Sequence, residues 1–353
     1  MEKKDRVRLA IVGVGAWSQV IADGIKRSGK VELVSCYTRN PEGRKRFAEA
    51  YGCDQDESFE KLLQRNDVDG LYITTPNAFH AAQTILAAQH GKHVMVDKPI
   101  ANTLEDGMAM INACRKAGVV LMIGHDIRRL AGNRKLKQLL DEGVIGDPVM
   151  AESNFSHELG FHLTPDQFRW HGDDSGCPGG ALMSMGIHHA DTLSYLLGPI
   201  ESAFAFFSHL YIPAEVEDVN QAVFRFASGV LGYLGCSYAA PKTHWITVYG
   251  TKAKASCTVS MPEVPIKDIF KVWSDVDRYT ELMLYRTGKS GEKIDLTMGD
   301  PIVEQIEEFA HCIRSGETPE TDGPKGFASL ALVRAAIESA RTGCQVPVRS
   351  TVG

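Results

Sequence analysis

The stretch VRLAIVGVGAWS, residues 7–18, decides the fold of the first part of the chain. It begins as a short apolar run typical of a buried strand and ends on Gly13 and Gly15, the first two places of a G-x-G-x-x-G pattern whose third place holds Ser18. The first glycine of such a pattern permits a tight turn, and the second lets a pyrophosphate approach the backbone at a helix N-terminus. An ordinary glycine turn before a capped helix gives the same letters. The position at the end of a first strand favours a dinucleotide site, with the phosphates beside Ala16, Trp17 and Ser18.

Four further apolar runs follow, separated by stretches of helical periodicity such as residues 78–89 and 103–117. The runs cover residues 31–37, 70–75, 92–97 and 119–124. Repeated strand-helix-strand units predict a doubly wound parallel sheet, a Rossmann domain over residues 1–126. Ligands of such sheets bind beyond the carboxyl ends of the strands, so we expect the functional residues there.

The end of the second run indicates which nicotinamide cofactor is preferred. An acid that binds the ribose 2′-hydroxyl of NAD is usual there, but this chain has Thr38, Arg39 and Asn40. A guanidinium beside a hydroxyl suits a 2′-phosphate, because its N–H donors can bind the phosphate that an acid would repel. We therefore predict NADP rather than NAD, with NAD as the alternative if Arg39 is only a solvated surface residue.

The third run ends in a turn that we expect to lie beside the cofactor. This turn contributes Thr75, Pro76, Asn77 and His80. Asn77 is also expected to cap the helix that follows, and His80 is given no chemical role.

The fourth run stops at Asp97, Lys98 and Pro99, a carboxylate and an amine at the end of a buried strand. A proline there turns the chain, through a trans or a cis bond, so that Lys98 points across the nicotinamide. An amine in this place can bond a substrate hydroxyl and share its proton during hydride transfer. A lone lysine at a strand end is usually only a solvated charge, so the prediction depends on the neighbouring glycine and TTPN turns.

Taken together, these motifs resemble the Gfo/Idh/MocA family of nicotinamide-dependent sugar and cyclitol oxidoreductases. The resemblance rests on the glycine turn and on six motifs in the expected order, namely TTPNAFHA, DKP, LMIGHDIRR, LLDEGVIGDPV, GGALMSMGIHHADTLSYLLG and ESARTGCQVPV. Asp97 replaces the glutamate of the family's Glu-Lys-Pro. The resemblance implies a C-terminal α+β domain, here residues 127–353, built on a large open antiparallel sheet that commonly packs against a partner subunit. The alternating runs 219–227, 229–240, 244–250 and 253–260 fit such a sheet independently.

A second group of polar residues lies at helical spacing in the C-terminal part. Ser184, His188 and Asp191 would share one helix face. The family pattern implies that His188 works beside Lys98 as acid or base, and that a carboxylate stands where this chain has Ser184. Asp191 either supplies that carboxylate or only ties down the helix. We also expect a protonated His188 to lower the pKa of Lys98 by repulsion.

Substrate contacts are expected from the segment after the fifth strand and from an aromatic-rich loop, residues 154–180. The candidates are Asp126, Arg128, His157, Arg169, Trp170, Ser184, His188 and Asp191. The histidines of the loop have no fixed ligand spacing, so no metal site is predicted.

Composition limits the partners. The net charge of −6 argues against nucleic acid, and the polar residues within the uncharged stretch 70–91 argue against a membrane span. Eight cysteines without a C-x-x-C pair suit reduced thiols in the cytoplasm. The expected protein is a homodimer or homotetramer that acts on a small molecule.

Three functions remain open from the sequence. The first is an oxidoreductase that acts on a secondary alcohol or carbonyl of a sugar or cyclitol. The second is a dihydrodiol or hydroxyaldehyde dehydrogenase on the same scaffold, for which the aromatic loop is the reason. The third is a catalytically silent dinucleotide sensor, suggested by Ser184.

Overall fold

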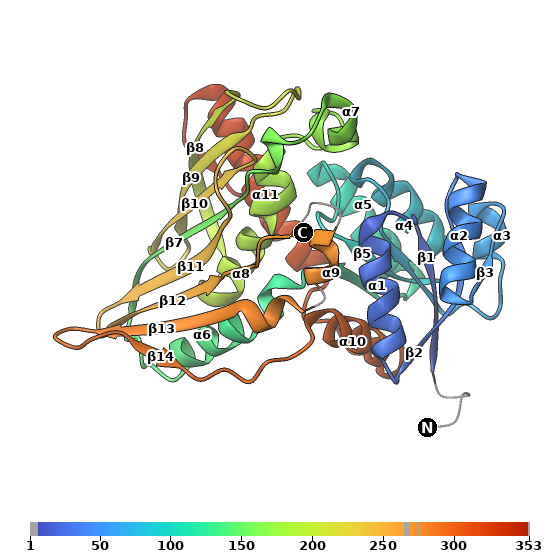
Figure 1. Ribbon diagram of the computed structural model, residues 1–353, viewed down its shortest axis with the longest axis horizontal. Helices are drawn as coiled ribbons and strands as arrows, with labels where there is room; N and C mark the ends of the chain where they lie inside the picture. Colours follow the sequence, from blue (N-terminus) through green and yellow to red (C-terminus); the bar gives the residue numbers. More distant parts are fainter. Residues whose placement is uncertain (1–5, 265–267, 274, 352–353) are drawn as a thin grey trace.

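The computed structural model describes residues 6–264, 268–273 and 275–351 of the chain (Figure 1). Its first part is a parallel sheet with the strand order β3-β2-β1-β4-β5-β6. The strands are β1 (Val7–Val12), β2 (Val31–Tyr37), β3 (Asp54–Gln55), β4 (Gly70–Ile73), β5 (His93–Asp97) and β6 (Leu121–Gly124). The helices between them are α1 (Ala16–Arg27), α2 (Pro41–Tyr51), α3 (Phe59–Leu63), α4 (His80–Gln89) and α5 (Leu104–Ala117). This is the predicted Rossmann arrangement.

The second part is built on a nine-stranded sheet with the order β14-β13-β12-β11-β7-β10-β9-β8-β15. The strands are β7 (Pro148–Ser156), β8 (Ile200–Ser208), β9 (Val219–Phe226), β10 (Leu231–Ser237), β11 (Thr243–Gly250), β12 (Ala253–Val259), β13 (Thr280–Arg286), β14 (Glu292–Ile294) and β15 (Val346–Pro347). Strands β7 and β10 run parallel, and the other neighbouring pairs are antiparallel. The predicted antiparallel sheet is confirmed with this one parallel pair.

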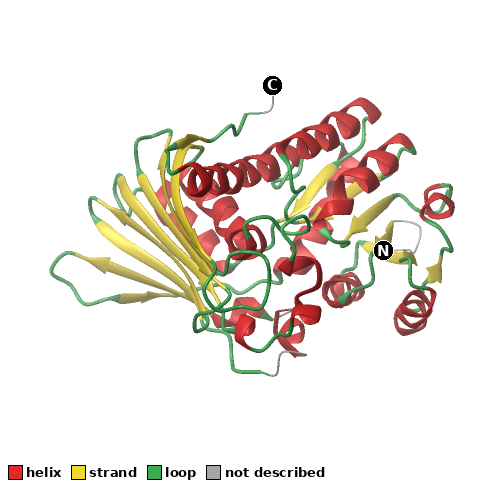
Figure 2. Ribbon diagram, turned by 90° about the horizontal axis from the view of Figure 1, so that it is seen from above, coloured by secondary structure: helices red, strands yellow, loops and turns green. Residues whose placement is uncertain are grey.

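Helices cover only one face of the large sheet. They are α6 (Ala131–Asp141), α8 (Ile187–Leu197) and α11 (Gly323–Thr342), which pack against β12 and β13, β7, and β8 respectively. Strand β9 shows the consequence, because Ala222, Phe224 and Phe226 are buried while Gln221, Val223 and Arg225 between them are exposed. Figure 2 shows the helices on the side of the sheet that faces the smaller sheet, and the opposite side without them.

One late helix returns to the first sheet. Helix α10 (Pro301–Ser315) packs on α1, and its residues Ile302, Ile306 and Phe309 share a core with Leu9. The contact is close, since a Cβ atom at Gly24 would lie 2.6 Å from Cγ2 of Ile302. The expected second domain, residues 127–353, therefore includes one helix that covers the first sheet.

The remaining short elements lie in the connections between these longer helices and strands. They are η2 (Asn77–Phe79), η3 (Ile127–Arg129), η4 (Leu159–Phe161), α7 (Pro165–Phe168), η5 (Arg169–Gly172), the π-helical turn η6 (Leu182–Gly186), α9 (Ile269–Trp273) and η8 (Val276–Tyr279). Helix α9 packs on α1. Within the described ranges, no helix is both long and apolar enough to cross a bilayer.

Candidate active site

The glycine turn leaves an open, uncapped helix start. Gly13 has φ +94°, and a Cβ atom there would lie 2.9 Å from the backbone of Thr74 and Thr75, so a side chain is excluded. Gly15 is the N-cap of α1, which receives no side-chain cap and has no acid in its first turn. Apart from Gly15 itself and its two chain neighbours, no described residue has an atom within 4 Å of a Cβ atom built on Gly15. This space and the unbonded N–H groups fit a pyrophosphate.

The residues after this turn divide into two roles. Ser18 is buried, and its hydroxyl donates to the Gly15 carbonyl over 2.6 Å, which stabilises the turn. Ala16 and Trp17 start the helix, and the ring of Trp17 meets Phe270 and Trp273 of α9 edge to face. Trp17 therefore joins the glycine turn to a segment from the other end of the chain.

Arg39 lies exposed at the end of β2. Its guanidinium lies 4.9 Å from the ring centre of Phe79 in η2, a cation–π contact across the mouth of the predicted ribose site. The Thr38 carbonyl accepts a hydrogen bond from Arg44, and Asn40 caps α2 with its side chain. The sequence from 38 to 40 places no carboxylate here.

The turn after β4 differs from the prediction in one respect. Helix α4 begins at His80 with Phe79 as its N-cap and without a side-chain capping bond, so the expected cap by Asn77 is wrong. Asn77 instead starts η2 after Pro76, and the Thr75 hydroxyl donates to Gln83. The ring nitrogens of His80 lie 3.0 Å from the Pro99 carbonyl and 2.8 Å from the Thr75 carbonyl, so this buried histidine ties two loops together.

Lys98 crosses from the first sheet to the second part of the chain. The Lys98–Pro99 bond is cis, one of the two forms considered from the sequence. The Lys98 ammonium donates to the backbone carbonyl of Ser184 over 2.6 Å. The two predicted catalytic segments, from residues 97–99 and 184–188, are thereby brought together.

Asp97 shares this environment and is only partly exposed to solvent. Burial raises its pKa to about 7 although the charge of Lys98 acts in the opposite direction. One carboxylate oxygen is buried without a hydrogen-bond partner among the described residues.

His188 faces a carboxylate, but not the one expected. Its Nδ1 atom lies 3.5 Å from Oδ1 of Asp126, and Oδ2 of Asp126 accepts a 2.7 Å hydrogen bond from the indole of Trp273. Burial, helped by the charge of Lys98, holds the pKa of His188 well below its usual value. This lowered pKa favours the neutral imidazole, whereas the expected repulsion of Lys98 requires an imidazolium.

Asp191 and Arg128 satisfy each other. The Arg128 guanidinium donates to both carboxylate oxygens of Asp191, over 2.7 Å and 2.5 Å, and both side chains are almost fully buried. Of the two roles considered for Asp191, the structure shows the one that ties down the helix. Because their polar groups face each other, we do not propose these two residues as substrate contacts.

Ser184 and His157 meet at Tyr238, a residue that the sequence analysis missed. The hydroxyls of Ser184 and Tyr238 form a hydrogen bond, and the ring of His157 stacks on that of Tyr238 with 5.5 Å between centres. Burial lowers the pKa of His157 to about 4. The side chains of Arg169 and Trp170 lie outside the part of the chain that the structure describes.

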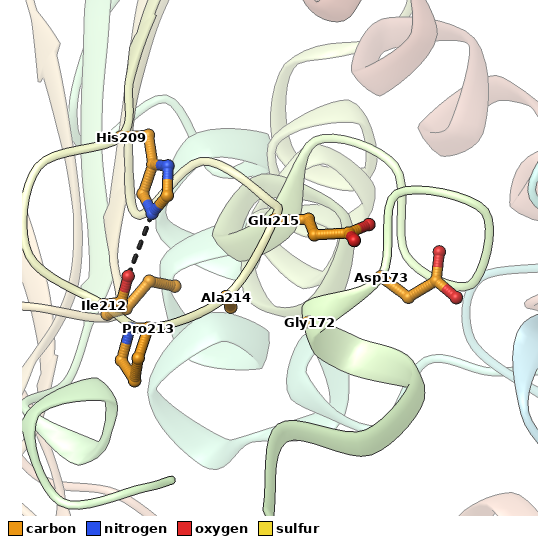
Figure 3. A pocket seen from close by; sticks show the side chains of 7 residues that line it. All are labelled: Gly172, Asp173, His209, Ile212, Pro213, Ala214 and Glu215. Carbon is orange, nitrogen blue, oxygen red and sulfur yellow. Dashed lines mark hydrogen bonds between the residues drawn. The ribbon is translucent and has the colours of Figure 1, made fainter. Parts of the chain in front are cut away.

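No group of three or more histidine, cysteine or acidic side chains in the described ranges could hold a metal ion. A pocket of about 400 Å³ is lined by Gly172, Asp173 and residues 209 and 212–215 (Figure 3), and neither Lys98 nor His188 is among the residues that line it. His209 closes its wall by a hydrogen bond to the Ile212 carbonyl.

Comparison with known sequences identifies the family of this chain. Residues 7–125 match the NAD-binding Rossmann fold of the oxidoreductase family, and residues 133–256 match the GFO/IDH/MocA C-terminal domain. The chain belongs to the Gfo/Idh/MocA family. It is an NAD(P)-dependent oxidoreductase, as the resemblance of its motifs predicted.

Individual members of the Gfo/Idh/MocA family match over nearly their whole length. The 1,5-anhydro-D-fructose reductase of Ensifer adhaerens is 28% identical over 340 residues, which cover 95% of this chain and 97% of that protein. The D-xylose 1-dehydrogenase [NADP(+)] of Haloarcula marismortui is 28% identical over 346 residues, or 95% and 91% of the two chains. A solved structure of a candidate NADPH-dependent oxidoreductase from Desulfitobacterium hafniense is 33% identical, with a TM-score of 0.92 over 99% of each chain.

Proposed function

We propose that this protein is an NADP-preferring dehydrogenase or reductase that acts on a secondary alcohol or carbonyl of a sugar or cyclitol. The observation that carries the proposal is the position of the Lys98 ammonium, which is held against the second part of the chain beside His188. The names of the two curated relatives, a sugar reductase and a sugar dehydrogenase, support the substrate class.

The cofactor would lie along the carboxyl edge of the first sheet. The open backbone at Gly15 and the start of α1 would hold its pyrophosphate, and Arg39 would bind the 2′-phosphate. Thr75, Pro76, Asn77, Asp97 and Lys98 form the rest of this edge. When bound, the nicotinamide supplies the acceptor or donor of the hydride.

His188 and Lys98 would act on the substrate hydroxyl and its proton. As the hydride leaves the carbon, the hydroxyl must lose its proton, and the neutral imidazole of His188 can accept it. The Lys98 ammonium would donate a hydrogen bond to the same oxygen and stabilise the negative charge that develops there. In the reductive direction, the protonated imidazole of His188 would return this proton to the carbonyl oxygen while Lys98 keeps its hydrogen bond to it.

A substrate screen combined with two variants tests this proposal. We would incubate the protein with aldoses, cyclitols and dihydrodiols and with NADP⁺ or NAD⁺, and follow the absorbance of the reduced nicotinamide. Lys98→Met and His188→Ala are each expected to lower kcat by about 10²–10⁴-fold with little change in cofactor affinity, and the double variant by less than the product. Lys98→Met with more than about a tenth of the wild-type kcat would contradict the assignment and favour a silent dinucleotide sensor.

The same proposal includes self-association and a reducing compartment. The helix-free face of the large sheet exposes Phe206, Val223 and Leu231, which is more apolar surface than a monomer usually leaves in water. We infer a homodimer or homotetramer formed through this face. All eight cysteines are free, which supports a place in the cytoplasm.

A further inference from the structure

Two buried polar atoms face each other beside the proposed base. They are Oδ1 of Asp126 and Nδ1 of His188, which lie 3.5 Å apart. Neither atom has a hydrogen-bond partner in the described part of the chain, and Asp126 is only 1% exposed. A buried polar pair without other partners gains stability only by bonding to each other, and a small side-chain rotation closes this distance to a hydrogen bond.

We infer that Asp126 is the positioning residue of His188, which fixes its tautomer and stabilises its protonated form during turnover. The inference rests on the proposed function. With Nδ1–H donating to the Asp126 carboxylate, the Nε2 atom of His188 keeps its lone pair for the substrate proton. Asp126 therefore acts through His188 and not on the substrate, which replaces its expected role as a substrate contact.

The helix that carries His188 does not itself supply the carboxylate that positions this histidine. Asp191 is bound on both oxygens by Arg128. Position 184, one helical turn before His188, holds a serine whose hydroxyl is bonded to Tyr238. The carboxylate that stabilises the protonated form of His188 therefore comes from the turn after β6 and not from the helix of His188.

Trp273 holds Asp126 in the orientation that this role requires. Its indole N–H donates to Oδ2 of Asp126 over 2.7 Å, which leaves Oδ1 directed at His188. The same ring lies edge to face with Trp17, with 6.3 Å between centres. Helix α9 thus connects the residue beside the glycine turn with the carboxylate of the base.

The electrostatic surroundings of His188 set the direction of the expected pH effect. Burial and nearby cations disfavour its charged form, so removal of the Asp126 carboxylate should lower its pKa further. The titratable and charged groups that face it are Lys98 at the end of β5, His125 and Asp126 after β6, His189 on α8 and His244 on β11.

The first test reads the tautomer in the unmodified protein. We would record nitrogen-15 spectra of histidine-labelled protein and assign His188 by its loss in His188→Gln. A neutral ring with the proton on Nδ1 is expected, and a proton on Nε2 overturns the inference. This test needs no substrate, so it remains decisive even if the substrate screen fails and the proposed function falls.

The second test compares Asp126→Asn with the wild type on the substrate found in the screen. We expect kcat to fall by about 10–100-fold, less than the loss of the base itself, and the acid limb of kcat/KM to move to lower pH by about 1–3 units. NADP affinity, read from tryptophan fluorescence, should stay within about twofold, which shows that the variant is folded. An unchanged kcat and an unchanged acid limb would overturn the inference.

A carboxylate returned to the helix provides the matched rescue. Ser184→Asp in the Asp126→Asn background restores a negative charge one turn before His188. We expect this double variant to regain at least a tenth of the lost kcat and to move the acid limb back toward its wild-type pH. This result is expected if Asp126→Asn acts by removing a charge and not by disturbing the packing.

Discussion

We expect the choice between NADP and NAD to depend on Arg39. Replacing it with alanine should weaken NADP binding by about 1–3 kcal/mol, because a charged hydrogen bond to the 2′-phosphate is lost, and should leave NAD binding nearly unchanged. Titration of the intrinsic tryptophan fluorescence with each cofactor measures both affinities. Arg46→Ala, which removes an exposed arginine from α2, is the control and should alter neither. Equal losses for both cofactors would show that Arg39 does not bind the phosphate.

Asp97 should make the protein less stable as the pH rises. Its pKa is raised by burial from 3.8 to about 7 in the folded chain, so the folded state binds the proton more tightly than the unfolded state. The stability that this proton contributes is fully present below pH 3.8 and is lost as the pH rises through about 7. Asp97→Asn should therefore gain up to roughly 4 kcal/mol relative to the wild type between pH 4 and pH 8.

Urea denaturation of both proteins across this pH range measures the difference. The gain should increase steadily between the two pKa values, and parallel stability curves for the two proteins would contradict the assigned pKa. Substrate turnover plays no part in this measurement.

At the residue scale, the sequence predicted which residue types meet but not their partners. Lys98 and His188 were predicted to act together because each lies in a motif whose neighbours suit that chemistry. The pairs Asp126 with Trp273 and Arg128 with Asp191 are separated by 147 and 63 positions, and no local pattern marks contacts of that range. Burial favours the neutral form of His188, and no residue spacing in the sequence reports that burial.

The ion pair of Arg128 and Asp191 fastens α8 to η3. Asp191→Asn should destabilise the fold by about 3–5 kcal/mol, because the guanidinium stays buried without its counter-charge. Equilibrium denaturation in urea measures this loss. Asp141→Asn, which breaks the exposed pair with Lys137, is the matched control and should cost less than about 1 kcal/mol. Similar losses for both variants would mean that the buried pair stabilises the fold no more than an exposed pair does.

Elements with one clear period were predicted well, and the others were not. Strand β9 alternates between buried and more exposed residues, and β4 of the Rossmann sheet is buried along its whole length. The π-helical turn at 182–186 was missed because its letters fit an ordinary helix. Helix α9, which brings Trp273 to Asp126, has only five residues, too few for a periodic signal.

At the scale of the whole molecule, we expect the open face of the large sheet to form the contact between subunits. Val223 is 51% exposed and lies between Phe204 of β8 and Tyr233 of β10 on that face. Val223→Asp should dissociate the oligomer, because a buried carboxylate without a partner is unfavourable in an interface. Sedimentation velocity at micromolar concentration measures the state.

A second exposed apolar residue supplies the control for this measurement. Leu210→Asp changes the loop after β8 and should leave the oligomer intact. A wild-type protein that sediments only as a 38.7 kDa species would refute assembly through the sheet.

The return of α10 to the first sheet bears on how the protein can be cut and recombined. Ile302, Ile306 and Phe309 pack in the same core as Leu9 and Ile21, although the two groups lie far apart in the sequence. A fragment that stops at residue 126 would expose to water the apolar residues that α10 covers, and we expect it to aggregate. A chimaera that exchanges the cofactor half must carry residues 301–315 with it, so the natural exchange unit is two pieces of chain.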